Sequence, residues 1–273
     1  MFETIRSIFG KPTLFQVVSD LHLEINQQYL SFEIPVCAEQ LILAGDVGWL
    51  VDYDHYCSFL QRQTDRFKLV FLVLGNHEFY NDTFAAGIQR ARHLEREVSL
   101  KGRLILLHRG CYDIPGSDIT VLGCTLWSKV AEEARDIVSL KIQDFKKIQE
   151  WTVDDHNGSH QMDITWLLGE IDAVQSKKRT LLVVTHHAPS LQGTSSPQHA
   201  NSPWSSAFAT DVLSQIPRST AVSSWVFGHT HYTTEFKHQG IRVMANQRGY
   251  VLLPAKDSKR PKDGFDVGKV IQV

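Results

Sequence analysis

The sequence predicts an α/β fold, and two observations carry that prediction. Short runs of apolar and β-branched residues recur along the chain, and several of them are almost continuously apolar. That pattern is typical of strands that are buried on both faces of a sheet. Longer segments whose apolar residues follow helical spacing lie between some of these runs. Alternating strands and helices predict buried sheets that are built from βαβ units.

The expected elements follow in chain order. Strands are expected at residues 13–19, 40–45, 68–75, 103–108, 119–123, 180–185, 224–228 and 241–246. Helices are expected at residues 53–66, 82–100, 131–150, 163–178 and 205–216. For the second of these helices, Asp82 is a favourable N-cap residue and Gly102 is a favourable residue just beyond the C-terminal end.

Two regions interrupt the alternation and are expected to be irregular. Residues 125–165 are polar, and residues 188–204 are rich in serine, proline and glycine. Long loops in compact domains commonly carry binding functions, so both regions are candidates for a substrate cap. No linker or internal repeat is evident, which predicts a single domain over residues 1–273.

For some residues in these regions and at the N-terminus, we expect a position in the structure and no role in the site. We expect three histidines to be exposed loop residues, with a place at the substrate entrance as the alternative: His156, His160 and His199. At the start of the chain, one apolar face of a short, packed helix is expected from Phe2, Ile5, Ile8 and Phe9.

The composition excludes several classes of protein. Hydrophobic residues make up 42% and charged residues 21% of the 273 residues, which is typical of a soluble globular protein. A formal net charge of −2 does not fit a dedicated nucleic-acid-binding protein. No apolar stretch approaches the ~20 residues of a membrane span, and the N-terminus does not resemble a secretory signal. The four cysteines form no C-x-x-C pair, so we expect reduced thiols and a cytoplasmic protein.

Polar residues that can bind metals or transfer protons follow five of the expected strands. They are Asp20 and His22, then Asp46, then Asn76, His77 and Glu78, then His186 and His187, and finally His229 and His231. The carboxyl ends of strands in an α/β sheet converge where ligands bind, so we expect these side chains to lie close together. Taken singly, these residues could have purely structural roles: Asp46 can cap a segment, Asn76 can form a turn, and His187 can be a core histidine. Five strand ends of this kind need a common cause.

The chemistry of these donors narrows the metal. Oxygen and imidazole donors without cysteine suit manganese, iron, zinc, nickel or magnesium. Seven donors are too many for one tetrahedral zinc ion, and they suit two metal ions that share a bridging carboxylate. Two metals about 3.5–4 Å apart form a clamp for in-line displacement at phosphorus. The sequence therefore indicates a dinuclear centre for phosphoester chemistry.

These motifs, in this order, resemble the calcineurin-like metallophosphoesterase superfamily over roughly residues 14–250. The resemblance implies a four-layer α/β/β/α sandwich with its site on loops at the strand ends. It assigns the first metal to Asp20, His22, Asp46 and His231, and the second to Asp46, Asn76, His186 and His229. Asp46 bridges the two metals, and a bridging hydroxide attacks phosphorus. His77 is no ligand in this scheme, but stabilises the transition state and protonates the leaving oxygen.

Three assignments stay open at this point. His186 directly follows its strand and is the expected ligand, with His187 as the alternative if the loop is offset. Trp49 stands where protein phosphatases of this superfamily carry an aspartate that orients the histidine, so Asp52, Asp54 or a backbone carbonyl is expected to orient His77 instead. Arg248 either contacts the substrate phosphate or is a turn arginine held by an aspartate or the backbone.

The predicted function is hydrolysis of a small phosphomonoester or phosphodiester by a dinuclear metal centre. The expected partner is a small phosphorylated molecule, with neither a membrane nor nucleic acid. Two alternatives remain at this stage. One is a metal-binding scaffold without catalysis, and the other is a dinuclear hydrolase or lyase that acts on a metabolite without phosphate.

Overall fold

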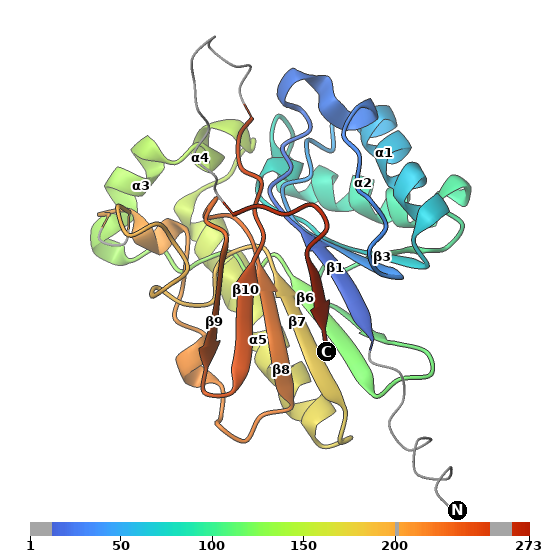
Figure 1. Ribbon diagram of the computed structural model, residues 1–273. Coiled ribbons are helices and arrows are strands. Elements are labelled where there is room, and N and C mark those ends of the chain that lie inside the picture. The colour runs from blue at the N-terminus through green and yellow to red at the C-terminus, as the bar shows by residue number, and fades with distance from the viewer. Residues whose placement is uncertain (1–12, 200–201, 252–263) are drawn as a thin grey trace, which may run out of the picture.

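The computed structural model describes residues 13–199, 202–251 and 264–273 (Figure 1). The helix expected from Phe2 to Phe9 lies outside the described residues. A first sheet has the strand order β11-β1-β2-β3-β4. Its strands are β1 (Leu14–Val18), β2 (Gln40–Ala44), β3 (Leu69–Val73), β4 (Leu104–Leu106) and β11 (Val270–Gln272). Strands β1 to β4 are parallel to one another, and β11 pairs antiparallel with β1.

A second sheet has the strand order β5-β6-β7-β8-β10-β9. Its strands are β5 (Gly110–Asp113), β6 (Ile119–Cys124), β7 (Thr180–Thr185), β8 (Val222–Phe227), β9 (Thr234–His238) and β10 (Ile241–Ala245). The four central strands are parallel, and β5 and β9 close the two edges in antiparallel pairing. The carboxyl ends of the central strands therefore point to one edge of the molecule.

The two sheets pack face to face, and helices cover their outer faces (Figure 1). Strand β2 shows how alternation builds these layers, because its side chains point to opposite faces in turn. Ile42 faces the other sheet and joins a core that contains Val184 of β7. Leu43 faces outward into a core that contains Phe59 of α1 (Tyr53–Arg66) and a leucine of α2 (Phe84–Arg96).

The second sheet is covered in the same way by one long helix. Leu167 of α5 (Val153–Gln175) packs in one core with Val183 of β7 and Trp225 of β8. The observed architecture is the four-layer α/β/β/α sandwich that the resemblance implied. No helix among residues 13–199, 202–251 and 264–273 has the length and apolar character needed to cross a bilayer.

The expected strands are confirmed to within a few residues at each end. Strands β5, β9 and β11 were not predicted, because they are short edge strands with polar or half-exposed side chains. The helix 53–66 is confirmed as α1. The expected helix 82–100 is shorter: Thr83, not Asp82, is the N-cap and accepts a hydrogen bond from the Ala86 N–H, and α2 ends at Arg96.

The predicted bounds of the helices at 131–150, 163–178 and 205–216 were wrong. Residues 205–216 form two 3₁₀ turns, Ser205–Ala207 and Leu213–Gln215, in place of a helix. Residues 131–150 contain the short helices α3 (Arg135–Lys141) and α4 (Asp144–Lys147). Helix α5 begins at Val153, well before residue 163, because Thr152 and Asp155 form a capping box that starts it.

Residues 125–165 are therefore largely helical, which corrects the expectation of an irregular region. The described part of 188–204 contains neither a helix nor a strand, as expected of a loop. His199 in that loop is exposed as predicted, but His156 and His160 are buried on α5. The expectation that these two are exposed was wrong, because the helix turns them toward the core.

The burial of His156 predicts a dependence of stability on pH. Burial and the nearby His160 lower the pKa of His156 to about 3. The unfolded chain therefore takes up a proton at this site as the pH falls below about 6.5, whereas the folded protein does not. The stability contributed by neutral His156 is present above that pH and is lost progressively toward the folded pKa.

Urea denaturation of the wild type and of His156→Gln at two pH values measures this contribution. Between about pH 7.5 and about pH 5.5, we expect the wild type to lose about 1 kcal/mol more unfolding free energy than the variant does. His93→Gln is the matched control, since the side chain of His93 is exposed on α2. Parallel losses in the wild type and the His156 variant would refute the assignment.

Candidate metal centre

The loops that follow β1, β2, β3, β7 and β8 meet at the carboxyl edge of the two sheets. The loop after β1 is bonded to the loop after β2, since the Asp20 N–H donates to the Gly45 carbonyl and the His22 N–H to the Asp46 carbonyl, both at 3.0 Å. Between β7 and β8, the Gly228 N–H donates to the His186 carbonyl at 2.9 Å. The backbone thus brings together the polar residues that lie far apart in the sequence.

One group of donors consists of Asp20, His22, Asp46 and His231, whose ligand atoms all lie within 4.8 Å of one another. The Nε2 atoms of His22 and His231 face each other at 2.9 Å. Carboxylate oxygens stand beside both rings: Asp20 Oδ1 lies 3.5 Å from His231 Nε2, and Asp46 Oδ2 lies 3.8 Å from His22 Nε2. Two imidazole nitrogens and two carboxylates that converge in this way can hold one cation.

A second group lies on the other side of Asp46. His186 Nε2 is 3.4 Å from Asp46 Oδ1 and 3.1 Å from Asn76 Oδ1. Asn76 Oδ1 also lies 3.1 Å from His229 Nδ1. Asp46 therefore presents one carboxylate oxygen to each group. Burial alone would raise the pKa of Asp46, but His186 and His77 hold it well below its usual value and keep the carboxylate ionised.

The backbone of the site is strained. Five of the seven candidate ligands adopt positive φ angles: Asp20 (53°), His22 (47°), Asp46 (52°), His229 (73°) and His231 (49°). This left-handed conformation costs of order 1–3 kcal/mol for a residue other than glycine, and such residues gather at functional sites.

Two glycines allow the loops to approach this closely. A Cβ atom on Gly75 would lie 2.1 Å from Asp46 Oδ1, and one on Gly228 would lie 2.2 Å from Ser19 Oγ. Neither distance is compatible with a side chain. Gly228, in the sequence VFGHTH, thus lets its strand end pack directly against the loop of Asp20.

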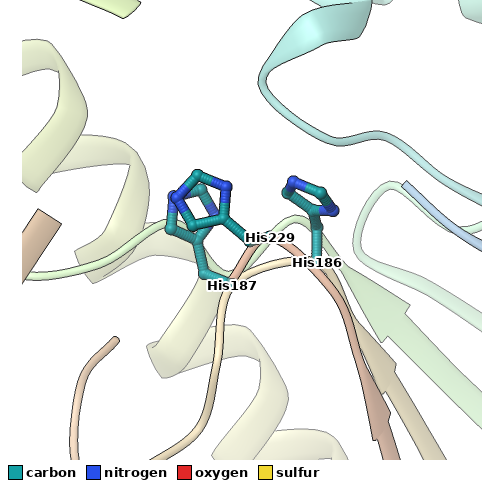
Figure 2. A group of neighbouring side chains, drawn as sticks. All are labelled: His186, His187 and His229. Atoms are coloured by element: carbon teal, nitrogen blue, oxygen red, sulfur yellow. The ribbon is translucent and has the colours of Figure 1, made fainter. Parts of the chain in front are cut away.

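His186 and His187 have different surroundings, which bear on the choice left open by the sequence (Figure 2). His186 Nδ1 donates to the Ala44 carbonyl at 3.0 Å, which turns Nε2 toward Asp46 and Asn76. His187 instead stacks on His229, with ring centroids 3.9 Å apart. Figure 2 shows the His187 and His229 rings overlapping while His186 stands apart. The geometry favours His186 as the ligand and His187 as a packing partner. A ring nitrogen of His187 also lies within 4.8 Å of ring nitrogens of His186 and His229.

His77 is oriented by Glu24, which was not among the expected residues. His77 Nδ1 lies 2.8 Å from Glu24 Oε1, and its Nε2 lies 3.0 Å from the hydroxyl of Tyr250. Asp52 was expected in this role but accepts a hydrogen bond from Tyr29 instead, and Asp54 is exposed on the first turn of α1. Glu24 follows Asp20 and His22 at the same spacing of two, and that spacing was the signal available in the sequence.

The charge at His77 follows from the same contacts. Burial lowers the pKa of His77, but Asp46 and Glu24 outweigh burial and raise it to about 9. The backbone N–H of His77 also donates to Asp46 Oδ1 at 2.9 Å. The His77 side chain is thus held in its charged form directly beside the two donor groups.

Asn76 is oriented by a residue from a distant part of the chain. Its Nδ2 donates to Asp144 Oδ1 at 2.7 Å, and the same oxygen accepts from the Tyr80 hydroxyl at 2.8 Å. These bonds turn Asn76 Oδ1 toward His186 and His229. Asp144 lies on α4, 68 residues from Asn76, and no local pattern in the sequence indicated this contact.

Glu78 joins the loops after β2 and β3. Its carboxylate accepts hydrogen bonds from the N–H groups of Val47 at 2.8 Å and Gly75 at 2.7 Å, and from the Tyr56 hydroxyl at 3.0 Å. Glu78 is therefore a structural residue of the site.

Arg248 has the contacts of a turn arginine. It donates to the Leu21 carbonyl at 2.9 Å and to Gln28 Oε1 at 2.6 Å, and its guanidinium lies 4.4 Å from the centre of the Phe32 ring. Of the two alternatives for this residue, the structure favours the one in which the backbone holds it.

Residues 14–233 match the sequence model of the calcineurin-like phosphoesterases. The chain belongs to this family. The chain is also similar to an uncharacterised protein of Acanthamoeba polyphaga mimivirus, with 29% identity over 263 residues. The match covers 87% of this chain and 91% of the viral protein.

Two solved structures share the fold. One is a phosphopantetheinyl hydrolase from Mycobacterium tuberculosis, with a TM-score of 0.61, 17% identity and 97% coverage of both chains. The other is a dimetal phosphatase from Danio rerio, with a TM-score of 0.53, 13% identity, and coverage of 85% of this chain and 86% of that one. Similarity at this level of identity establishes the common fold.

Proposed function

We propose that this protein is a dinuclear metal-dependent phosphoesterase that hydrolyses a phosphomonoester or phosphodiester of a small molecule. The observation that carries the proposal is the position of Asp46, with one oxygen 3.8 Å from His22 and the other 3.4 Å from His186. A carboxylate shared by two sets of imidazole and oxygen donors suits a pair of metal ions. The donors suit manganese, iron, zinc, nickel or magnesium.

In this proposal, the first metal is held by Asp20, His22, Asp46 and His231. The second is held by Asp46, Asn76, His186 and His229. The donor chemistry fits, because His22 and His231 point ring nitrogens at each other beside two carboxylates in a largely buried site. When bound, the two metals would supply Lewis acidity toward phosphate oxygens and lower the pKa of a water.

His77 is the proposed general acid. Glu24 accepts a hydrogen bond from the Nδ1–H of His77, so that Nε2 carries the second proton of the imidazolium toward the site. The Tyr250 hydroxyl, 3.0 Å from Nε2, occupies a place where an oxygen can accept that proton. In the reaction, the proton would pass from Nε2 to the leaving oxygen as the P–O bond breaks, leaving neutral His77 held by Glu24.

Asp144→Ala should weaken binding at the second group alone, because Asn76 loses the partner that orients its amide. We expect the affinity for one Mn²⁺ to fall by about 10–100-fold while the other Mn²⁺ is held as before. Titration of metal-free protein with Mn²⁺, followed by calorimetry, measures both sites. Asp136→Ala on α3 is the control, since this aspartate is exposed. Equal weakening of both sites would show that Asp144 supports the fold and not the second group.

Hydrolysis of p-nitrophenyl phosphate and its bis ester by Mn²⁺-loaded protein tests the function. Turnover of either ester, lost on chelation and restored by metal, is the expected result. A protein that binds two metals yet hydrolyses no phosphate ester would fit the alternative of a non-phosphate hydrolase or lyase. A metal-binding scaffold would turn over no substrate, and His77→Ala would leave its behaviour in the cell unchanged.

A further inference from the structure

A cavity of about 320 Å³ opens beside the proposed metal centre. His231 and Thr230, at the end of β8, form part of its wall. The other walls come from the loop after β7 and the 3₁₀ turn at Ser205–Ala207. Phe208 connects the two sites, since it lines the cavity and its ring lies 4.9 Å from that of His229. A group attached to a phosphate at the metal centre can therefore extend into this cavity.

The cavity is lined by four apolar residues, five residues with hydroxyl groups and two histidines. Trp204, Phe208 and Leu191 supply flat or apolar walls, and Ser205 adds a hydroxyl. The Oγ atom of Ser202 is buried and has no hydrogen-bond partner within the described part of the chain. A buried hydroxyl without a partner is unfavourable, and a ligand that hydrogen-bonds to it would remove that penalty.

Because the described lining has no acidic or basic residue other than histidine, the cavity does not suit several kinds of leaving group. Among the described residues that form the cavity there is no lysine, arginine, aspartate or glutamate, and the titratable ones are His199 and His231. A second phosphate or an acidic peptide would need a cation, ordinarily arginine or lysine, at this place. The volume stands at the lower end of the range of about 300–1,000 Å³ for small-molecule pockets, so it suits one ring system and not a polymer.

We infer that this cavity binds the leaving group of the substrate, and that the substrate is a phosphate ester of an uncharged, ring-containing alcohol of about nucleoside size. The ring would stack between Trp204 and Phe208, and a hydrogen-bonding group on it would reach Ser202. This inference rests on the proposed function for the position of the phosphate. The cavity itself can be tested without turnover.

Adenosine 5′-monophosphate, p-nitrophenyl phosphate, ethyl phosphate and pyrophosphate separate the classes of leaving group. The wild type should prefer adenosine 5′-monophosphate to ethyl phosphate by at least about tenfold in kcat/KM, since both esters release a primary alcohol and differ mainly in the ring. Binding of the free alcohols, which does not depend on leaving-group reactivity, distinguishes a nucleoside from a simple aryl alcohol. Preference for pyrophosphate or for ethyl phosphate would overturn the inference.

Trp204→Ala should lower kcat/KM for the preferred ring-containing ester about tenfold, while ethyl phosphate changes by less than about twofold. Ser202→Ala removes only a hydroxyl and should lower kcat/KM about fivefold for an ester that hydrogen-bonds to it. This variant tests the cavity even if the tryptophan variant fails to fold. Trp166→Ala is the matched control, a half-buried tryptophan on α5 that packs against the core of the second sheet. An equal loss for ethyl phosphate in Trp204→Ala would contradict a role in binding the leaving group.

Calorimetric titration with the corresponding free alcohol, adenosine or p-nitrophenol, measures binding to the cavity without any hydrolysis. The inference is supported if the wild type binds the alcohol, Trp204→Ala binds it more weakly and Trp166→Ala binds it as the wild type does. This holds even if no ester is hydrolysed, in which case only the proposed function fails. Hydrolysis of esters without binding of either alcohol, and without an effect of Trp204→Ala, would overturn the inference and leave the proposed function intact.

Discussion

Asp46→Asn is expected to lower phosphoesterase activity by at least about 10³-fold, the largest effect of any single substitution in the site. Asparagine keeps the size of the side chain but removes the charge and one of the two carboxylate oxygens. Both donor groups use this residue, with Asp46 oxygens 3.8 Å from His22 Nε2 and 3.4 Å from His186 Nε2. Loss of the negative charge should therefore weaken both metals, and the group that faces the amide nitrogen should be weakened more.

Metal content by mass spectrometry and kcat/KM with p-nitrophenyl phosphate measure the two parts of this prediction. Asp54→Asn is the control, because Asp54 is exposed on the first turn of α1 near the same edge of the fold. A variant of Asp46 that retains two metals and near-normal activity would remove it from the bridging position. Unchanged thermal unfolding of the metal-free variant would show that the loss is not one of folding.

His77→Ala should lower kcat by roughly 10²–10⁴-fold while metal content stays unchanged, because His77 is proposed to give a proton and not to bind a metal. Its ring lies between Glu24 and Tyr250, and only its backbone N–H contacts Asp46 at 2.9 Å. This loss is expected for an alkyl ester such as ethyl phosphate, whereas p-nitrophenyl phosphate, whose leaving group departs without a proton, should keep most of its rate. Loss of a metal in this variant would make His77 a ligand instead.

Glu24→Gln separates orientation from proton transfer in the same prediction. The amide keeps a hydrogen bond to His77 Nδ1 but loses the charge that holds the imidazolium, so kcat should fall by at least about tenfold without a change in KM. Glu33→Gln, on the exposed surface beside Arg62, should change neither quantity. A fall in metal content in Glu24→Gln would assign this carboxylate to the metals and not to His77.

Most of the fold could be predicted because its central strands are buried on both faces. Buried apolar residues run without a break over residues 41–44 in β2 and 181–184 in β7, and that continuity distinguishes them from helices. The edge strand β9 alternates half-exposed and exposed residues and gave no such signal. The start of α5 was placed too late because Asp154 and Asp155, which are polar, form its first turn.

The candidate ligands could be predicted for a different reason. Each lies within four residues of the carboxyl end of a strand, so the topology of parallel sheets gathers them without knowledge of any side-chain contact. The residues that orient them do not follow this rule. Asp144 reaches Asn76 from a helix whose position depends on tertiary packing, and neither composition nor spacing predicts it. Glu24 lies close in sequence, but its role depends on a loop with left-handed residues, which the sequence pattern does not specify.

The number of metal ions bound per chain tests the central claim most directly. Metal-free protein should be dialysed against a series of Mn²⁺ concentrations and its bound metal measured alongside hydrolysis of p-nitrophenyl phosphate. The proposal predicts two Mn²⁺ per chain at saturation, with activity rising as the second site fills. Saturation at one Mn²⁺ per chain, or activity that is complete before any metal is bound, would contradict a dinuclear centre bridged by Asp46.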